Sequence, residues 1–96
     1  MLYLVSYDVS TSTPAGRARL RRVAKACEDY GVRVQNSVFE CVLEYEGFLQ
    51  LRHRLAGLID EKTDSLRFYP MGKRGREKVV HIGVERAFDV EGPLVL

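Results

Sequence analysis

Residues 1–8 read Met1-Leu2-Tyr3-Leu4-Val5-Ser6-Tyr7-Asp8, a nearly unbroken apolar run that ends in an acid. An apolar run of this length predicts a short buried strand, which carries the carboxylate of Asp8 to the rim of a sheet. Sheets of the α/β type expose their chemistry at such rims, because the backbone leaves the core there. An acid at a strand end also commonly closes an Asx-turn or caps a helix, so position alone leaves a structural role open.

The rest of the chain predicts two helices and three or four further strands. Thr13 and Pro14 are typical of an N-cap and a first helical residue. Apolar residues then recur at helical spacing from Leu20 to Tyr30, and Gly31 follows as an expected left-handed C-cap. A second apolar stripe predicts a helix over about 46–60. Strands are expected over 66–71, over 79–84 and over 34–45, the last either as one strand or as two short ones.

This order of elements predicts an α+β protein with the ferredoxin-like, split βαβ arrangement. Four to five mostly antiparallel strands would carry two helices on one face. The 96 residues make one domain, residues 1–96. The apolar tail over 93–96 is too short to form a strand alone. It is either a disordered end or a strand added to the sheet edge of a second copy.

The composition is that of a globular protein, with 46% hydrophobic and 29% charged residues. The apolar run over 1–8 is too short for a secretory signal and no stretch approaches a membrane span, so we expect a cytoplasmic protein without a membrane partner. The net charge is only +2, but basic residues concentrate over 17–25 and 73–78. Two such blocks fit a nucleic-acid partner, and they also fit a solvated helix face and a solvated loop.

Several classes of chemistry are excluded by missing motifs. The glycine-containing loop at 72–76 lacks the Walker A pattern, and no dinucleotide-binding fingerprint is present. Cys27 and Cys41 are far apart and have no zinc-ligand spacing, so we expect both to be core thiols.

Asp8 has no obvious second carboxylate in the sequence to help it hold a metal ion. One carboxylate with water is a weak magnesium site. Two copies of Asp8 that face each other across the axis of a homodimer would double the negative charge at one point. A hydrated Mg²⁺ between them could activate water or neutralise a phosphate oxygen. If Asp8 is catalytic, the sequence therefore predicts a homodimer.

Cations and rings are available near this carboxylate. Phosphodiester chemistry needs cations to position phosphates and to stabilise charge on oxygen. Arg17 and Arg19 begin the helix that follows the first strand, and Arg33 begins the next strand; plain surface solvation is the alternative for all three. Tyr7 and Phe39 are the nearest rings, and either could stack on a base, although we expect at least one in the core. A basic loop adds three candidates for binding backbone phosphate: Lys73, Arg74 and Arg76.

Four segments carry a more specific signal. They are Tyr7-Asp8-Val9-Ser10, residues 19–25, residues 30–41 with Arg33-Val34-Gln35-Asn36-Ser37-Val38-Phe39-Glu40-Cys41, and residues 64–72 with Asp64-Ser65-Leu66-Arg67-Phe68-Tyr69-Pro70. In this order they resemble the family of CRISPR-associated protein two, the smaller of the two spacer-acquisition proteins. The likeness covers residues 1–72 and is greatest to members found in type I-C systems.

The resemblance implies a ferredoxin-like homodimer with exchanged C-terminal strands, in which residues 84–96 pack on the partner. It implies a metal-dependent endonuclease that cuts single-stranded RNA or double-stranded DNA, with Asp8 as catalytic residue and ligand of Mg²⁺. It also implies a CRISPR-associated integrase as partner. The substrate-binding residues carried over by the resemblance are Tyr7, Arg17, Arg19, Arg33 and Phe39.

Two functions therefore stay open. In the first, the protein is an enzyme in which Asp8 of both protomers holds the metal ion. In the second, the dimer is a non-catalytic adaptor that bridges integrase dimers and holds the protospacer duplex through its basic blocks, and Asp8 is dispensable.

Overall fold

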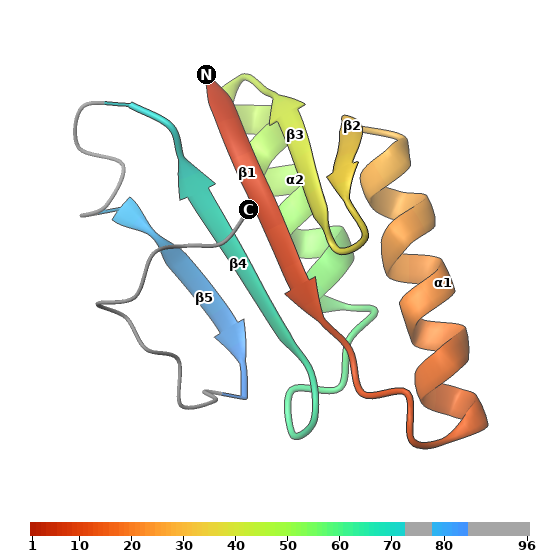
Figure 1. Ribbon diagram of the computed structural model, residues 1–96. Coiled ribbons are helices and arrows are strands. Elements are labelled where there is room, and N and C mark those ends of the chain that lie inside the picture. Colours follow the sequence, from red (N-terminus) through yellow and green to blue (C-terminus); the bar gives the residue numbers. More distant parts are fainter. Residues whose placement is uncertain (73–77, 85–96) are drawn as a thin grey trace.

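The computed structural model describes residues 1–72 and 78–84, which form an α+β fold (Figure 1). The elements in chain order are β1 (Leu2–Asp8), α1 (Pro14–Glu28), β2 (Val32–Gln35), β3 (Val38–Val42), α2 (Tyr45–Ala56), β4 (Ser65–Pro70) and β5 (Val80–Gly83). This order confirms the predicted succession of strands and helices.

The strands form one antiparallel sheet in the order β2-β3-β1-β4-β5. The first four have the ferredoxin-like order, which confirms the predicted fold class, and β5 extends the sheet beside β4. Strand β1 lies in the middle, where Val5 is paired with Phe39 of β3 and with Phe68 of β4. Because β1 has neighbours along both edges, its apolar run is largely buried, as the sequence predicts.

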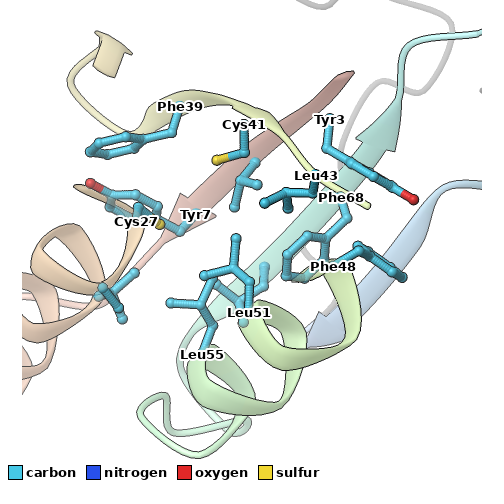
Figure 2. Close-up of a cluster of buried hydrophobic side chains, with 14 of the residues drawn as sticks. Tyr3, Tyr7, Cys27, Phe39, Cys41, Leu43, Phe48, Leu51, Leu55 and Phe68 are labelled. Atoms are coloured by element: carbon cyan, nitrogen blue, oxygen red, sulfur yellow. The ribbon is translucent and has the colours of Figure 1, made fainter. Parts of the chain in front are cut away.

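The two faces of the sheet differ, because successive residues of a strand point to opposite sides. Tyr3, Val5 and Tyr7 belong to the core cluster formed with the two helices, which Figure 2 shows in close-up. The intervening residues of β1 and their register partners point away from the helices. We call this side the outer face; β1 contributes to it Leu2, Leu4, Ser6 and Asp8.

Helix α1 begins where the sequence predicts. The Thr13 hydroxyl accepts a hydrogen bond from the Gly16 amide at 3.0 Å, and Pro14 is the first helical residue. This satisfies one of the orphan amides of the first turn. Val23 and Cys27 then lie fully buried against the sheet.

The prediction of a left-handed cap at Gly31 is wrong. Helix α1 ends at Glu28 with Asp29 as a right-handed C-cap, and among the described glycines only Gly83 has a positive φ. Gly31 is needed for space instead, since a Cβ there would collide with the carbonyl oxygen of Glu40 on β3.

The stretch over 34–45 forms two strands, the second of the two alternatives. Strands β2 and β3 are joined by a turn, and the register shifts between Arg33 and Gln35. Tyr45, expected in the strand alternation, begins α2 and is 67% exposed. Leu43 is the last residue of this run in the core, because the extended Glu44 turns the chain into the helix. Helix α2 ends at Ala56, earlier than predicted.

Within the described ranges, no helix is long and apolar enough to cross a bilayer. The predicted packing of residues 84–96 on a partner falls, apart from Val84, outside the residues that the structure describes. The same holds for Lys73, Arg74 and Arg76.

Candidate active site

Asp8 is the last residue of β1, and its side chain is exposed on the outer face. The register pairs Asp8 with Ser65 of β4, which is in turn paired with Gly83 of β5. The sequence expectation that β1 delivers a carboxylate to the rim of the sheet is therefore confirmed.

A second row of polar residues runs beside Asp8 on the same face. Ser6 of β1 is paired with Arg67 of β4, and Arg67 with His81 of β5. Two residues along a strand separate the rows by roughly 7 Å. The imidazole Nε2 of His81 donates to the carbonyl oxygen of Val84 at 3.1 Å. Sequence reasoning missed Arg67 and His81, because the alternation within each strand was visible but the register between strands was not.

The loop after β1 is held by a second acid, Asp64, which sequence reasoning also missed as a site residue. The Ser10 amide donates to Asp64 Oδ1 at 2.9 Å, and the Asp60 amide donates to Asp64 Oδ2 at 2.9 Å. Arg19 Nε donates to Oδ2 at 2.8 Å, and the Thr63 hydroxyl to Oδ1 at 3.0 Å. The only signal in the sequence was an acid immediately before an apolar strand.

These hydrogen bonds determine the charge state of Asp64, whose side chain is fully buried. Burial by itself raises the pKa of a carboxyl, because it disfavours the charged form. The hydrogen bonds from Arg19, from the amides of Asp60 and Ser10, and from the Thr63 hydroxyl outweigh this effect and hold the pKa of Asp64 below its ordinary value of 3.8. Asp64 is therefore an ionised, fully occupied carboxylate.

The three predicted arginines lie in different settings. Arg17 is exposed, and its Nη1 donates to the Thr11 carbonyl oxygen at 3.2 Å, which keeps it beside the loop after β1. Arg19 is 19% exposed and paired with Asp64. Arg33 is two strands away from β1, in the register row of Val5, so the structure does not bring it beside Asp8.

Both predicted rings point into the core, on the face opposite Asp8. Tyr7 is 4% exposed and its hydroxyl donates to the Asn36 carbonyl oxygen at 3.2 Å; Phe39 is fully buried. Their centroids are 6.2 Å apart, and both lie at the same end of the cluster in Figure 2. Burial, reinforced by the Cys27 thiol and opposed by the Arg33 guanidinium, raises the pKa of Tyr7 above 10.0. In this conformation neither ring is accessible to a base.

Within the described residues, Asp8 is the exposed carboxylate at the end of the central strand and the candidate ligand of a metal ion. No group of three histidine, cysteine, aspartate or glutamate side chains in the described part of the chain could hold one. Asp64 is not available as a second ligand, since it already accepts four hydrogen bonds. Mg²⁺ binds through one or two carboxylates and keeps several waters. An exposed carboxylate at a strand end, such as Asp8, therefore fits a hydrated divalent metal ion as one of its ligands.

The fold and site define a class: ferredoxin-like proteins with one exposed acid at the end of the central strand. The chain matches the family model of CRISPR associated protein Cas2 over residues 1–79. It is 55% identical over 96 residues to the CRISPR-associated endoribonuclease Cas2 of Nitratidesulfovibrio vulgaris, covering all of this chain and 94% of the relative. It is 52% identical over 95 residues to the CRISPR-associated endonuclease Cas2 of Halalkalibacterium halodurans, covering 99% of each.

The solved structures agree. The crystal structure of Streptococcus pyogenes Cas2 at pH 6.5 superposes with a TM-score of 0.71 and 59% identity, covering 86% of this chain and all of that one. This chain belongs to the CRISPR-associated Cas2 family. The relatives' names give no CRISPR subtype, so the likeness to type I-C members stays a prediction.

Proposed function

We propose that this chain is a metal-dependent endonuclease of CRISPR-based antiviral defence that acts in spacer acquisition. It hydrolyses phosphodiester bonds in single-stranded RNA or double-stranded DNA. The observation that carries the proposal is the exposed carboxylate of Asp8 at the end of the central strand. The relatives from N. vulgaris and H. halodurans, named endoribonuclease and endonuclease, support the class of reaction.

The site is completed by a second copy of the chain. Asp8 lies on the outer face, which also presents Val42 with 78% and Val32 with 68% of their surface exposed. Exposed apolar side chains on a sheet face favour association with another protein surface. A two-fold axis that passes beside Asp8 brings the two Asp8 carboxylates together, because only a residue at the axis faces its own copy in the partner.

In this dimer the two Asp8 carboxylates would hold a hydrated Mg²⁺, which would supply Lewis acidity and an activated water when it is bound. Arg17, exposed and anchored to the loop after β1, binds a phosphate of the substrate backbone. Asp64 stays outside the metal shell and holds the loop. In spacer acquisition the partner is the CRISPR-associated integrase, and nucleic acid is the substrate.

The test compares wild-type protein with Asp8→Asn and with a matched control, Asp29→Asn. Asp29 is also an exposed carboxylate, but it lies at the far end of α1, about 24 Å along the helix axis from Thr13. Labelled single-stranded RNA and double-stranded DNA are incubated with each protein, with magnesium and with chelator. We expect magnesium-dependent cleavage by wild type and Asp29→Asn, and none by Asp8→Asn at unchanged melting temperature.

Cleavage at the wild-type rate by Asp8→Asn would overturn the assignment of Asp8. No cleavage by any of the proteins, with salt-sensitive duplex binding by all three, would support the non-catalytic adaptor instead. The binding measurement is informative because each neutralised phosphate contributes about −0.9 to the slope of log affinity against log salt.

A further inference from the structure

The Asp64 carboxylate joins three segments that are far apart in the chain. It accepts from the Ser10 amide in the loop after β1, from the Asp60 amide in the loop after α2, and from Arg19 in the second turn of α1. A buried carboxylate that accepts this many hydrogen bonds keeps one orientation, since each donor has no water to replace its partner. The three segments are therefore held in one arrangement.

Both the backbone amide and the backbone carbonyl oxygen of Ser10 are held by neighbouring residues. Its amide is 2.9 Å from Asp64 Oδ1, and its carbonyl oxygen packs so closely on Gly16 that a Cβ at residue 16 would collide with it. Because Thr13 caps the same helix through the Gly16 amide, the loop between Asp8 and α1 is attached at both ends. The position of this loop depends on the pairing of Ser10 with Asp64.

The backbone of Asp64 is fixed as well. Its carbonyl oxygen accepts from the Val84 amide at 2.8 Å, and Gly83 packs against that carbonyl in a positive-φ conformation (φ 100°) that glycine adopts without strain. The following residue, Ser65, is the register partner of Asp8. Asp64 is thus rigid on both its main chain and its side chain, next to the residue that pairs with Asp8.

The orientation of Asp8 depends on this anchoring because Asp8 is the last residue of β1, where the pairing with the neighbouring strands ends. The register with β3 ends at Ser6, while the register with β4 continues to Asp8. The Tyr7 amide still donates to the Ser37 carbonyl oxygen in the turn between β2 and β3 at 3.1 Å. Beyond Tyr7, the backbone direction at Asp8 also depends on where the chain is anchored next. That anchor is Ser10.

We propose that Asp64 is a positioning residue for Asp8: through the Ser10 amide it orients the end of β1 so that the Asp8 carboxylate points outward from the sheet. Arg19 takes part in the same positioning, since its Nε donates to Asp64 Oδ2. The proposal deepens the proposed function and rests on it for its effect on cleavage. The placement of the loop can be measured in metal-free protein.

The experiment uses Asp64→Asn, which keeps the shape but loses the charge and one acceptor. Arg19→Gln and Arg19→Lys vary the partner, and Arg54→Gln removes the exposed Arg54–Asp29 ion pair as a control. The first measurement is amide hydrogen exchange at Ser10, with Val5 in the middle of β1 as reference. The second is kcat and KM for cleavage of single-stranded RNA with magnesium.

We expect the Ser10 amide of Asp64→Asn to exchange at least about tenfold faster, because a hydrogen bond to a charged acceptor is lost, while Val5 stays protected. We expect kcat to fall about ten- to hundredfold with KM nearly unchanged, since a small misplacement of a catalytic group acts mainly on the chemical step. Arg19→Gln should show the same pattern, Arg19→Lys should restore most of both quantities, and Arg54→Gln should match wild type.

Unchanged Ser10 exchange in Asp64→Asn, or equal acceleration at Ser10 and Val5, would overturn the positioning role. So would a variant that exchanges faster at Ser10 but cleaves with wild-type kcat. These outcomes differ from failure of the proposed function, in which wild-type protein cleaves nothing; that result would also remove any role of Asp64 in cleavage.

Discussion

The guanidinium carbon of Arg33 lies 5.2 Å from the centroid of the Phe39 ring, and its Nη2 is 3.6 Å from Glu28 Oε1. The cation therefore covers a ring that is itself fully buried and packed on Tyr7. Two residues that the sequence suggested as ligands of nucleic acid are in contact with each other at the edge of the core. In this arrangement Phe39 contributes to stability, and the guanidinium of Arg33 is paired with Glu28 and packed on the ring.

The first prediction concerns Phe39. Phe39→Ala should destabilise the protein by about 3–5 kcal/mol, because it leaves a cavity in a packed core. Urea unfolding measures the change, and Leu49→Ala, at a position 41% exposed on α2, should cost about 1 kcal/mol or less. A Phe39→Ala protein of nearly wild-type stability that no longer binds single-stranded RNA would show that the ring stacks on bases instead.

The second prediction separates Arg17 from Arg19. Arg17→Gln should reduce the steepness of the salt dependence of duplex binding by about 0.9 for each phosphate contact that is lost. Arg19→Gln should change the slope by less than half of this, because the Asp64 carboxylate already neutralises that guanidinium. Affinity is measured by fluorescence anisotropy over a range of salt concentrations. Equal changes of slope in the two variants would identify Arg19 as a phosphate ligand.

The third prediction concerns alkaline pH. Burial raises the pKa of Cys27 from 9.0 to about 12 and that of Cys41 from 9.0 to about 11. Above pH 9 the unfolded chain releases these protons while the folded protein keeps them. The free energy of unfolding should therefore fall as the pH rises from 9 to 11.

Urea unfolding in the presence of reductant, repeated between pH 8 and 11, measures this loss. Cys27→Ala should lose less stability over the same range than wild type does, since one of the two thiols is gone. Parallel pH profiles of wild type and Cys27→Ala would contradict the assignment of the loss to Cys27.

The fourth prediction compares two helical glycines. Gly16→Ala should cost about 1–3 kcal/mol, because its Cβ would displace the carbonyl oxygen of Ser10. Gly47→Ala in α2 should stabilise the protein by about 0.5–1 kcal/mol, since its Cβ would meet the Leu43 side chain at 3.5 Å in ordinary contact and alanine favours the helix. Thermal unfolding of both variants checks the pair. A Gly16→Ala protein at least as stable as wild type would mean that the loop at Ser10 is not clamped.

The sequence located the ends of elements best where a local rule applies. Thr13 and Pro14 marked the start of α1, because a cap hydroxyl and a proline act within one turn. Gly31 and Tyr45 were misjudged, because the conformation of each depends on what it packs against. Gly31 lies against the backbone of Glu40, and Tyr45 follows the point where the chain leaves the core.

The candidate site likewise combines features that local sequence determines with features that depend on tertiary packing. By itself the sequence determined that a buried strand ends in Asp8 and that two helices pack on one side of the sheet; these follow from periodicity along the chain. Only the tertiary structure decided that Tyr7 and Phe39 point away from Asp8, that Arg19 is held by Asp64, and that Arg67 and His81 share its face. The physical reason is that register between strands and the partner of a buried charge depend on segments distant in sequence, which local pattern does not encode.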